Sequence, residues 1–195
     1  MIRCNRMRCR GVDRGMGTQS REDRHVIATM RSDFDAGFTE LVRMYQPTVY
    51  AGARRMTPGR EAAQDVAQDT FVRAYRALRG FDGERMDAMR FRPWLWTIAL
   101  NVCRSRARRP GRELELTDPE AVAVDDDEAI DEVMWRSLLS KLSVPQRNAV
   151  VLRHVLDLPI AEIAEITGRP AGTVKADISR GLTRLRGLMN EEEHQ

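Results

Sequence analysis

Residues 158–186 carry residue types suited to reading DNA bases. Gly168 can form a tight turn between two amphipathic runs, and Pro170 can open the second run as a helix. Small and hydrogen-bonding side chains near the start of such a helix are what contacts with base edges in the major groove require. The pattern predicts a helix-turn-helix, and a plain helical hairpin with a solvated basic face is the alternative. The candidate DNA-binding residues are Thr173, Lys175, Ala176, Asp177, Arg180 and Arg184.

A second segment, residues 90–109, combines arginines with aromatic rings and contains no acidic residue. Exposed rings stack on unpaired bases while guanidinium groups hold phosphates, a combination typical of single-strand binding. Trp94 and Trp96 are two positions apart and cannot share one helical face. If one of them lies in the core, the other is therefore expected near the surface. The alternative is that both rings are buried and the arginines only solubilise the surface.

A third feature is an acidic stripe formed by Glu61, Asp65 and Asp69, spaced four residues apart. Like charges at this spacing destabilise an isolated helix, so a surface that pairs with the stripe would offset the cost. Two simpler explanations remain open. Glu61 can stabilise the helix N-terminus, and Asp69 can pair with Arg73 one turn later.

The sequence offers no support for catalysis. None of the three histidines lies beside a serine or cysteine in a nucleophile motif, and there is no Gly-rich phosphate loop. Three cysteines are too few and too scattered for a disulfide framework, and Cys4 and Cys9 lack nearby histidine ligands. We therefore expect a non-enzymatic protein with no cofactor, metal or small-molecule substrate. Without a long apolar run or signal peptide, it is expected in the cytoplasm with no membrane insertion.

Charge is distributed unevenly along the 195 residues, although the net charge is only +3. Residues 113–132 contain ten acidic residues and no lysine or arginine, which leaves +13 on the remainder of the chain. Two basic bodies joined by an acidic strap are expected to bind a polyanion.

Hydrophobic spacing predicts three long helices in the N-terminal half, over residues 34–56, 60–79 and 91–109, with a polar loop at 80–90. Four more helices are predicted after the acidic stretch, over 130–142, 145–155, 159–167 and 170–189. The expected fold is all-α, with a three-helix-type N-terminal bundle and a C-terminal helix-turn-helix domain joined by a flexible linker. The predicted boundaries are a disordered Arg-rich extension at 1–30, the first domain at 31–110, the linker at 111–129, the second domain at 130–190 and a tail at 191–195.

Four motifs in register resemble those of the bacterial extracytoplasmic-function (ECF) sigma factors. They are DVAQDTFVRAY at 65–75, RPWLWTIALNV at 92–102, LSVPQR at 142–147 and GTVK at 172–175. The resemblance implies binding to core RNA polymerase, through the β′ clamp and the β subunit, and promoter-specific initiation of transcription. It also implies an anti-sigma factor as a partner, and an acidic linker that runs toward the RNA exit path.

The resemblance assigns roles to individual residues. Core polymerase would be bound by Asp65, Gln68, Asp69, Phe71, Arg73 and Tyr75. The minus-ten element, opened to a single strand, would be bound by Phe81, Arg90, Trp94, Trp96, Asn101, Arg104, Arg106 and Arg108. The double-stranded minus-35 element would be read by the helix that follows Pro170.

One departure from the family pattern concerns the predicted recognition helix. Many relatives carry Ser-Arg after GTVK, whereas Ala176 and Asp177 follow here. A carboxylate can accept a hydrogen bond from cytosine but repels phosphate, so a different minus-35 sequence is expected. Two other classes remain as alternatives: a helix-turn-helix regulator whose first domain senses a ligand or binds a partner protein, and a helical interaction module that binds no DNA.

Overall fold

The computed structural model describes residues 19–107 and 127–192, and within these ranges the secondary structure is helical, with no strand. This confirms the all-α fold. The helices are α1 (Arg21–Ser32), α2 (Phe34–Met56), α3 (Arg60–Leu78), α4 (Gly83–Asp87), α5 (Phe91–Ala107), α6 (Asp127–Ser140), α7 (Val144–Val150), the π-helix η2 (Val151–Val155), α8 (Ile160–Thr167) and α9 (Ala171–Glu192).

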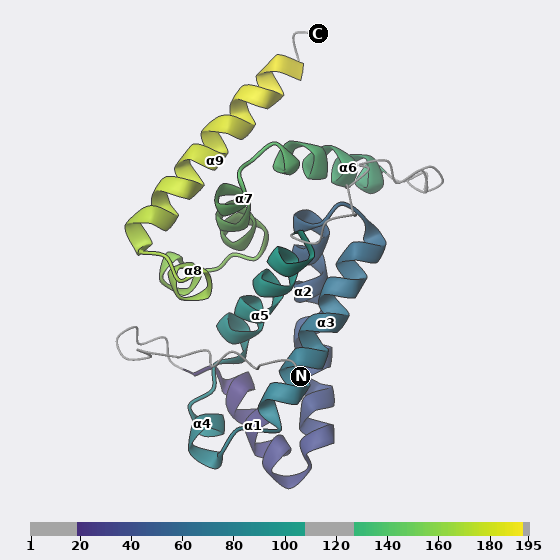
Figure 1. Cartoon of the computed structure of the whole chain (residues 1–195), viewed down its shortest axis with the longest axis vertical. Coiled ribbons are helices and arrows are strands. Elements are labelled where there is room, and N and C mark those ends of the chain that lie inside the picture. Colours follow the sequence, from purple (N-terminus) through teal and green to yellow (C-terminus); the bar gives the residue numbers. More distant parts are fainter. Residues whose placement is uncertain (1–18, 108–126, 193–195) are drawn as a thin grey trace.

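Helices α1 to α5 form an N-terminal body (Figure 1). Helix α2 packs against α1 and α3, and α5 packs against α3. Phe91, Leu95 and Trp96 place large apolar side chains from α5 in the centre of this core. The predicted bounds are confirmed for α2, and α3 ends one residue earlier than predicted. Helix α2 continues through Pro47.

The N-terminal extension was predicted to be disordered as far as residue 30, and this is wrong for residues 21–30. They form most of α1, which begins with a capping box in which Ser20 and Asp23 satisfy each other's backbone N–H groups. Val26, Ile27 and Met30 are buried against the bundle. Their spacing is helical, but the neighbouring arginines obscured it. Residues 1–18, with Cys4 and Cys9, lie outside the described residues.

The predicted loop at 80–90 contains the short helix α4. Asp82 is its N-cap and accepts a hydrogen bond from the Arg85 N–H at 2.8 Å. Met86 and Met89 are buried and hold the segment against the body. The Gln19 side chain donates to the backbone carbonyls of Asp87 and Met89, so the start of α1 is tied to the same segment.

Helices α6 to α9 form a C-terminal body that contains the predicted helix-turn-helix. Gly168 ends α8 in the left-handed conformation, with φ of 67°, where glycine carries no steric penalty. Val174, Ile178 and Leu185 form the buried stripe of α9, as predicted. Helix α6 begins at Asp127, so the last three residues of the predicted linker are helical, and the rest of the linker lies outside the described residues.

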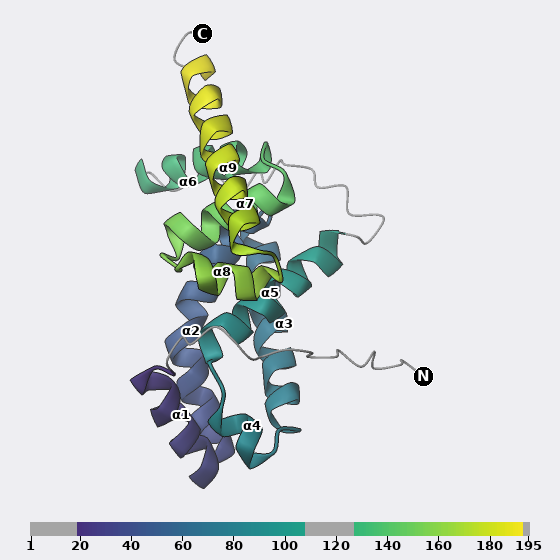
Figure 2. The ribbon, with the colours of Figure 1, turned by 90° about the vertical axis from the view of Figure 1, so that its left-hand side faces the viewer.

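The two bodies pack directly against each other along the long axis of the molecule (Figures 1 and 2). Helix α5 contacts α8, and α2 contacts α6 and η2. A single apolar cluster runs from Val26 in α1 to Leu188 in α9. The sequence predicted two domains but not their contact. None of the described helices is long and apolar enough to cross a membrane.

Gly52 permits the close approach of α2 to α5. A Cβ atom at this position would lie 2.2 Å from Cη2 of Trp96, a contact that requires the ring to move. We expect Gly52→Ala to lower the free energy of unfolding by about 1–3 kcal/mol, the usual cost of overpacking a core. Gly187→Ala is the control, because a Cβ there meets nothing within 4 Å and alanine favours a helix by about 0.5–1 kcal/mol. Urea denaturation measures both, and equal stability of the two variants would contradict the packing argument.

Candidate nucleic-acid interface

Helix α9 presents a polar face near its N-terminus. Lys175, Arg180 and Arg184 are exposed, and Thr173 and Ala176 are half-buried. The opposite face is held in the core by the buried stripe of α9, so this polar face is fixed in orientation. Four of the six residues predicted to bind the minus-35 element, Thr173, Ala176, Arg180 and Arg184, therefore lie on one accessible side of α9. Lys175 is exposed on another side, because it is two positions from Thr173.

The sixth, Asp177, was predicted to accept a hydrogen bond from a base, and its position does not fit this role. Its side chain is only 6% exposed and is held by two arginines. One carboxylate oxygen accepts from Arg169 and the other accepts from Arg180, the latter at 3.0 Å. Both oxygens are thus already used within the protein.

The two tryptophans of α5 have different environments. Trp96 is 1% exposed and packs in the core, so the prediction that it binds DNA is wrong for this structure. Trp94 is half-buried and lies edge-on to Phe81, with ring centroids 5.8 Å apart. The Arg85 guanidinium lies over the Phe81 ring, 3.8 Å from its centroid. An aromatic and cationic cluster therefore lies between α4 and α5. The spacing argument had predicted only that one tryptophan would lie in the core and the other nearer the surface.

The C-terminal part of α5 carries the other predicted minus-ten residues. Arg104 is half-buried and donates to the Asn101 side chain at 3.1 Å. Arg106 donates to Asp65 at 2.7 Å and to Asp69 at 2.9 Å. The acidic stripe of α3 therefore has a partner within the chain, which the sequence did not reveal. Arg108 lies outside the described residues.

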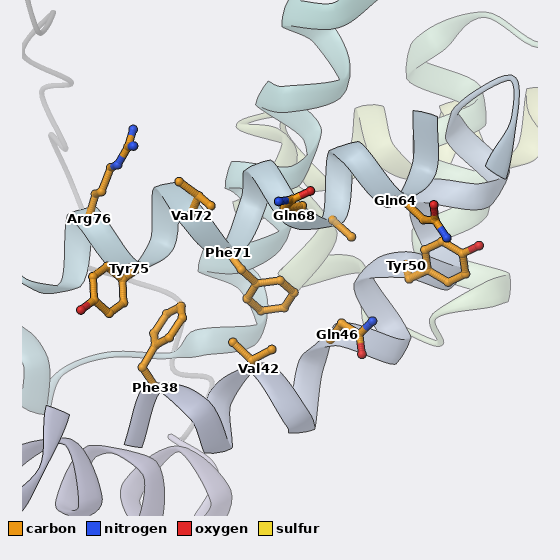
Figure 3. Close-up of a pocket in the computed structure, with 11 residues that line it drawn as sticks. Phe38, Val42, Gln46, Tyr50, Gln64, Gln68, Phe71, Val72, Tyr75 and Arg76 are labelled. Atoms are coloured by element: carbon orange, nitrogen blue, oxygen red, sulfur yellow. The ribbon is translucent and has the colours of Figure 1, made fainter. Parts of the chain in front are cut away.

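An apolar groove of about 790 Å³ lies between α2 and α3 of the N-terminal body (Figure 3). Three of the residues predicted to bind core polymerase, Gln68, Phe71 and Tyr75, line it. Phe71 is largely buried, and the Tyr75 hydroxyl donates to Asp35 at 2.9 Å. The other three, Asp65, Asp69 and Arg73, do not line the groove. Arg73 is exposed, and the two aspartates face α5.

Metal and thiol chemistry have no evident site in the described part of the chain. No group of three or more His, Cys, Asp or Glu residues there could hold a metal ion. Cys103 is the one free cysteine among the described residues, and burial raises the pKa of its thiol to about 11. A thiol with so high a pKa is a poor nucleophile at neutral pH.

Comparison with known proteins gives a consistent result. The Sigma-70 region 2 family matches residues 41–113, and the Sigma-70 region 4 family matches residues 132–185. The ECF RNA polymerase sigma factor SigW of Bacillus subtilis is 32% identical over 185 residues, covering 86% of this chain and 96% of SigW. The chain belongs to the sigma-70 family and is an ECF sigma factor. It directs promoter-specific transcription initiation by RNA polymerase.

Other similar proteins agree. The RNA polymerase sigma-E factor of Streptomyces avermitilis is 34% identical over 155 residues, covering 76% of this sigma factor and 83% of the relative. The solved structure of CnrH in complex with the cytosolic domain of CnrY matches with a TM-score of 0.68 and 28% identity, covering 87% of this chain and 98% of CnrH. RpoE of Bartonella quintana, solved with the anti-sigma factor NepR, matches with a TM-score of 0.63 and 26% identity, covering 78% and 96%.

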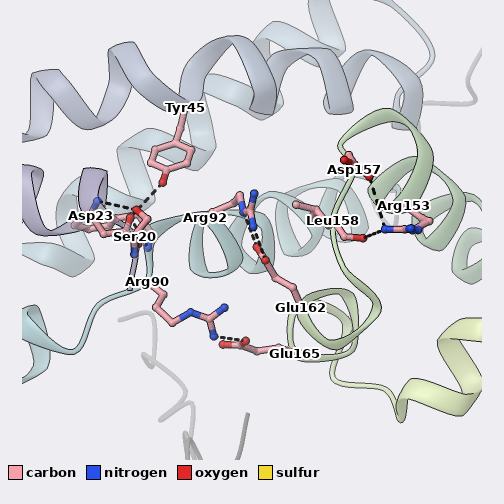
Figure 4. A network of polar contacts seen from close by, with 11 residues as sticks. Ser20, Asp23, Tyr45, Arg90, Arg92, Arg153, Asp157, Leu158, Glu162 and Glu165 are labelled. Carbon is pink, nitrogen blue, oxygen red and sulfur yellow. Dashed lines mark hydrogen bonds and ion pairs between the residues drawn. The ribbon is translucent and has the colours of Figure 1, made fainter. Parts of the chain in front are cut away.

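In this sigma factor, two glutamates of region 4 form ion pairs with the arginines at the start of α5 (Figure 4). Arg92 donates twice to Glu162, with both distances 2.7 Å, and Arg90 donates to Glu165 at 2.7 Å. Glu162 is only 5% exposed, and its hydrogen bonds raise the pKa of the Arg92 guanidinium above the usual value. Glu165 of α8 therefore covers the predicted minus-ten residue Arg90, and Glu162 holds the neighbouring Arg92 in a bidentate contact of the kind that arginine also makes with phosphate.

Asp23 fixes the start of α5 from within the N-terminal body. It accepts from the Tyr45 hydroxyl at 3.2 Å and from the Phe91 N–H at 3.4 Å (Figure 4). Burial, followed by the charge of Asp23, raises the pKa of Tyr45 well above its usual value, so the hydroxyl remains a donor at every physiological pH.

Sequence reasoning missed Glu162, Glu165 and Arg169 as contributors to these interfaces. The two glutamates are three residues apart in α8 and thus lie on one face, which is a weak signal for a shared partner. Nothing local indicated that the partner is α5, 70 residues earlier in the chain.

The packed arrangement of the two bodies is here called the closed form. The ion pairs between the start of α5 and α8 are expected to stabilise it. In Glu162→Gln/Glu165→Gln, each arginine loses the charge of its partner and one of the partner's two acceptor oxygens. The contact of buried Glu162 is worth about 1.5–3 kcal/mol, and that of the more exposed Glu165 about 0–1 kcal/mol. We expect amide hydrogen exchange in α8 to accelerate at least about tenfold, since opening becomes less costly. Glu84→Gln, an exposed charge on α4, is the control and should not alter exchange in α8. Unchanged protection in the double variant would show that apolar packing alone closes the protein.

Proposed function

We propose that this sigma factor is a non-enzymatic cytoplasmic initiation factor whose two bodies bind separate promoter elements once the contact between α5 and α8 has opened. The observation that carries the proposal is the placement of α5. Arg104 and Arg106 on this helix, and Arg90 just before it, are predicted minus-ten residues, and region 4 carboxylates bind Arg90 and the neighbouring Arg92 in the closed chain.

The minus-ten strand is proposed to bind along α5. Trp94 and Phe81 offer ring edges and faces for an unstacked base, and Arg104 with Asn101 offers hydrogen-bond donors about two to three turns later. Arg106 contributes as a phosphate contact only if it exchanges the carboxylates of α3 for the DNA. Trp96 is assigned to the core and no longer belongs to this surface.

The minus-35 duplex is proposed to meet the exposed face of α9. Arg180 and Arg184 lie on that face, and Thr173 and Ala176 beside them are small enough to let the helix enter the major groove. Lys175 is exposed on another side of the same turn. The two bodies share one apolar cluster, and Arg104 of α5 lines a small pocket with Asp177 of α9. The proposal therefore requires that the bodies separate when the minus-35 duplex binds.

The closed form also provides a way to inhibit the sigma factor. The related CnrH and RpoE structures were solved as complexes with CnrY and with the anti-sigma factor NepR. We extend this to the present chain and propose an anti-sigma factor that binds the closed form. By mass action, such a partner stabilises closure and competes with core polymerase.

Core polymerase is proposed to bind the groove between α2 and α3. Val72 lies in the groove and is 40% exposed, so Val72→Asp places a charge there without entering the core. We expect the variant to lose core affinity by more than about tenfold and to give little promoter-specific transcript. Met44→Asp is matched, because Met44 is 37% exposed on α2 but does not line the groove.

The assay combines core RNA polymerase with the full chain on a library of promoter templates. Promoter-directed transcripts are expected with the wild type and with Met44→Asp. If the wild type produces none, the rival interpretation as a regulator that does not use polymerase gains support. If Val72→Asp is fully active, the groove is not the docking face.

Single-strand capture is tested by Arg104→Ala in the assembled holoenzyme. We expect affinity for the minus-ten non-template strand to fall about tenfold, because a half-buried guanidinium beside the strand is lost. Arg24→Ala removes the same charge from the exposed face of α1 and serves as the control. Fluorescence anisotropy with a labelled oligonucleotide measures both, and equal affinities would remove Arg104 from the interface.

A further inference from the structure

Asp177 joins the turn of the helix-turn-helix to its recognition helix. Its side chain is 6% exposed, whereas the side chains of Arg169 and Arg180 are 36% and 61% exposed. Arg169 lies immediately after Gly168 in the turn, and Arg180 lies one turn beyond Asp177 in α9. The carboxylate therefore anchors two guanidinium groups whose outer parts face solvent.

Each arginine retains donors for another ligand. A guanidinium has five N–H donors in a planar fork, and the contact with Asp177 engages one nitrogen of each arginine. Fixing that nitrogen lowers the rotational freedom of a long side chain before any ligand binds. The remaining donors are thus held in position rather than free to sample many rotamers.

The position of Arg169 indicates phosphate as the ligand. It precedes the N-terminus of α9, where unpaired backbone N–H groups and the helix dipole favour an anion. Phosphate contacts are also what set a recognition helix in register on its duplex. In the closed chain Arg104 of α5 lines a small pocket with Arg169 and Asp177, so this surface is free for a duplex only after opening.

We infer that Asp177 is a positioning residue that holds Arg169 and Arg180 as a clamp for the phosphates that flank the minus-35 sequence. The inference rests on the proposed function and adds Arg169 to the minus-35 surface. It also reverses the expected effect of Asp177 on DNA affinity. A carboxylate near DNA repels phosphate, whereas a carboxylate that organises two arginines strengthens binding.

The sign of the effect separates these two roles. Asp177→Asn keeps the side-chain shape but replaces one acceptor oxygen with a donor nitrogen, so one arginine loses its partner. We expect the holoenzyme to bind the minus-35 duplex about tenfold more weakly, although a negative charge has been removed. The probe is the best duplex that the wild-type holoenzyme selects from a library randomised at minus-35. Asp157→Asn is the matched control, because it removes one exposed charge beside Arg153 in the same body and should not weaken binding.

Arg169→Ala and the combination with Asp177→Asn complete the test. Arg169→Ala should reduce the slope of log K against log salt by about 0.9, the value for one lost phosphate contact. In that background Asp177→Asn should have a much smaller effect than in the wild type, because the two residues act together. Urea denaturation monitors folding, and if Asp177→Asn does not fold, the salt slope of Arg169→Ala decides the question.

Three results would overturn the inference: tighter or unchanged binding by Asp177→Asn, additive effects of the two substitutions, or an unchanged salt slope for Arg169→Ala. Promoter-directed transcription by the wild type is measured in the same series. Its absence would overturn the proposed function, whereas normal transcription with unaffected variants would overturn only the role of Asp177.

Discussion

The packing of α5 on two sides is the constraint on which the other features depend. One side carries Phe91, Leu95 and Trp96 into the apolar core of the N-terminal body. The other side contacts α8, where Arg92 and Glu162 form a bidentate ion pair. The helix cannot rotate without losing one set of contacts. Its orientation is therefore fixed, and with it the direction in which the predicted minus-ten residues point.

This constraint gives the closed chain a physical basis for competition. Two of the predicted minus-ten arginines, Arg90 and Arg106, are already bound by carboxylates, so DNA would have to replace those contacts. Such an exchange costs little when the DNA arrives, because charge is replaced by charge. It still excludes weaker ligands, because a desolvated guanidinium without a partner is unfavourable. Closure thus uses Arg90, a residue that is also predicted to bind the minus-ten element.

The same chemistry recurs elsewhere in the molecule. Asp65 and Asp69 bind Arg106, and Asp177 binds Arg169 and Arg180. In the first cluster two carboxylates that would repel each other share one arginine, and in the second one carboxylate lies between two arginines that would repel each other. The planar fork of arginine suits this use better than the ammonium of lysine, since it can hold a carboxylate and still offer donors outward. These ion pairs therefore reduce the repulsion among the many arginine side chains of the described residues.

Local chemistry determined much of this protein. Apolar spacing located α2, α3 and α5, the left-handed Gly168 and its flanking stripes specified the helix-turn-helix, and four motifs identified the family, because these signals lie within one or two helical turns. Tertiary structure decided which tryptophan is buried, since the ring of Trp96 fits against Gly52 of α2 in the core whereas Trp94 lies against Phe81. It also decided the partners of Asp65, Asp177 and Glu162. Whether a charged residue faces a ligand or its own chain depends on which helix packs opposite, and that contact joins residues far apart in the sequence.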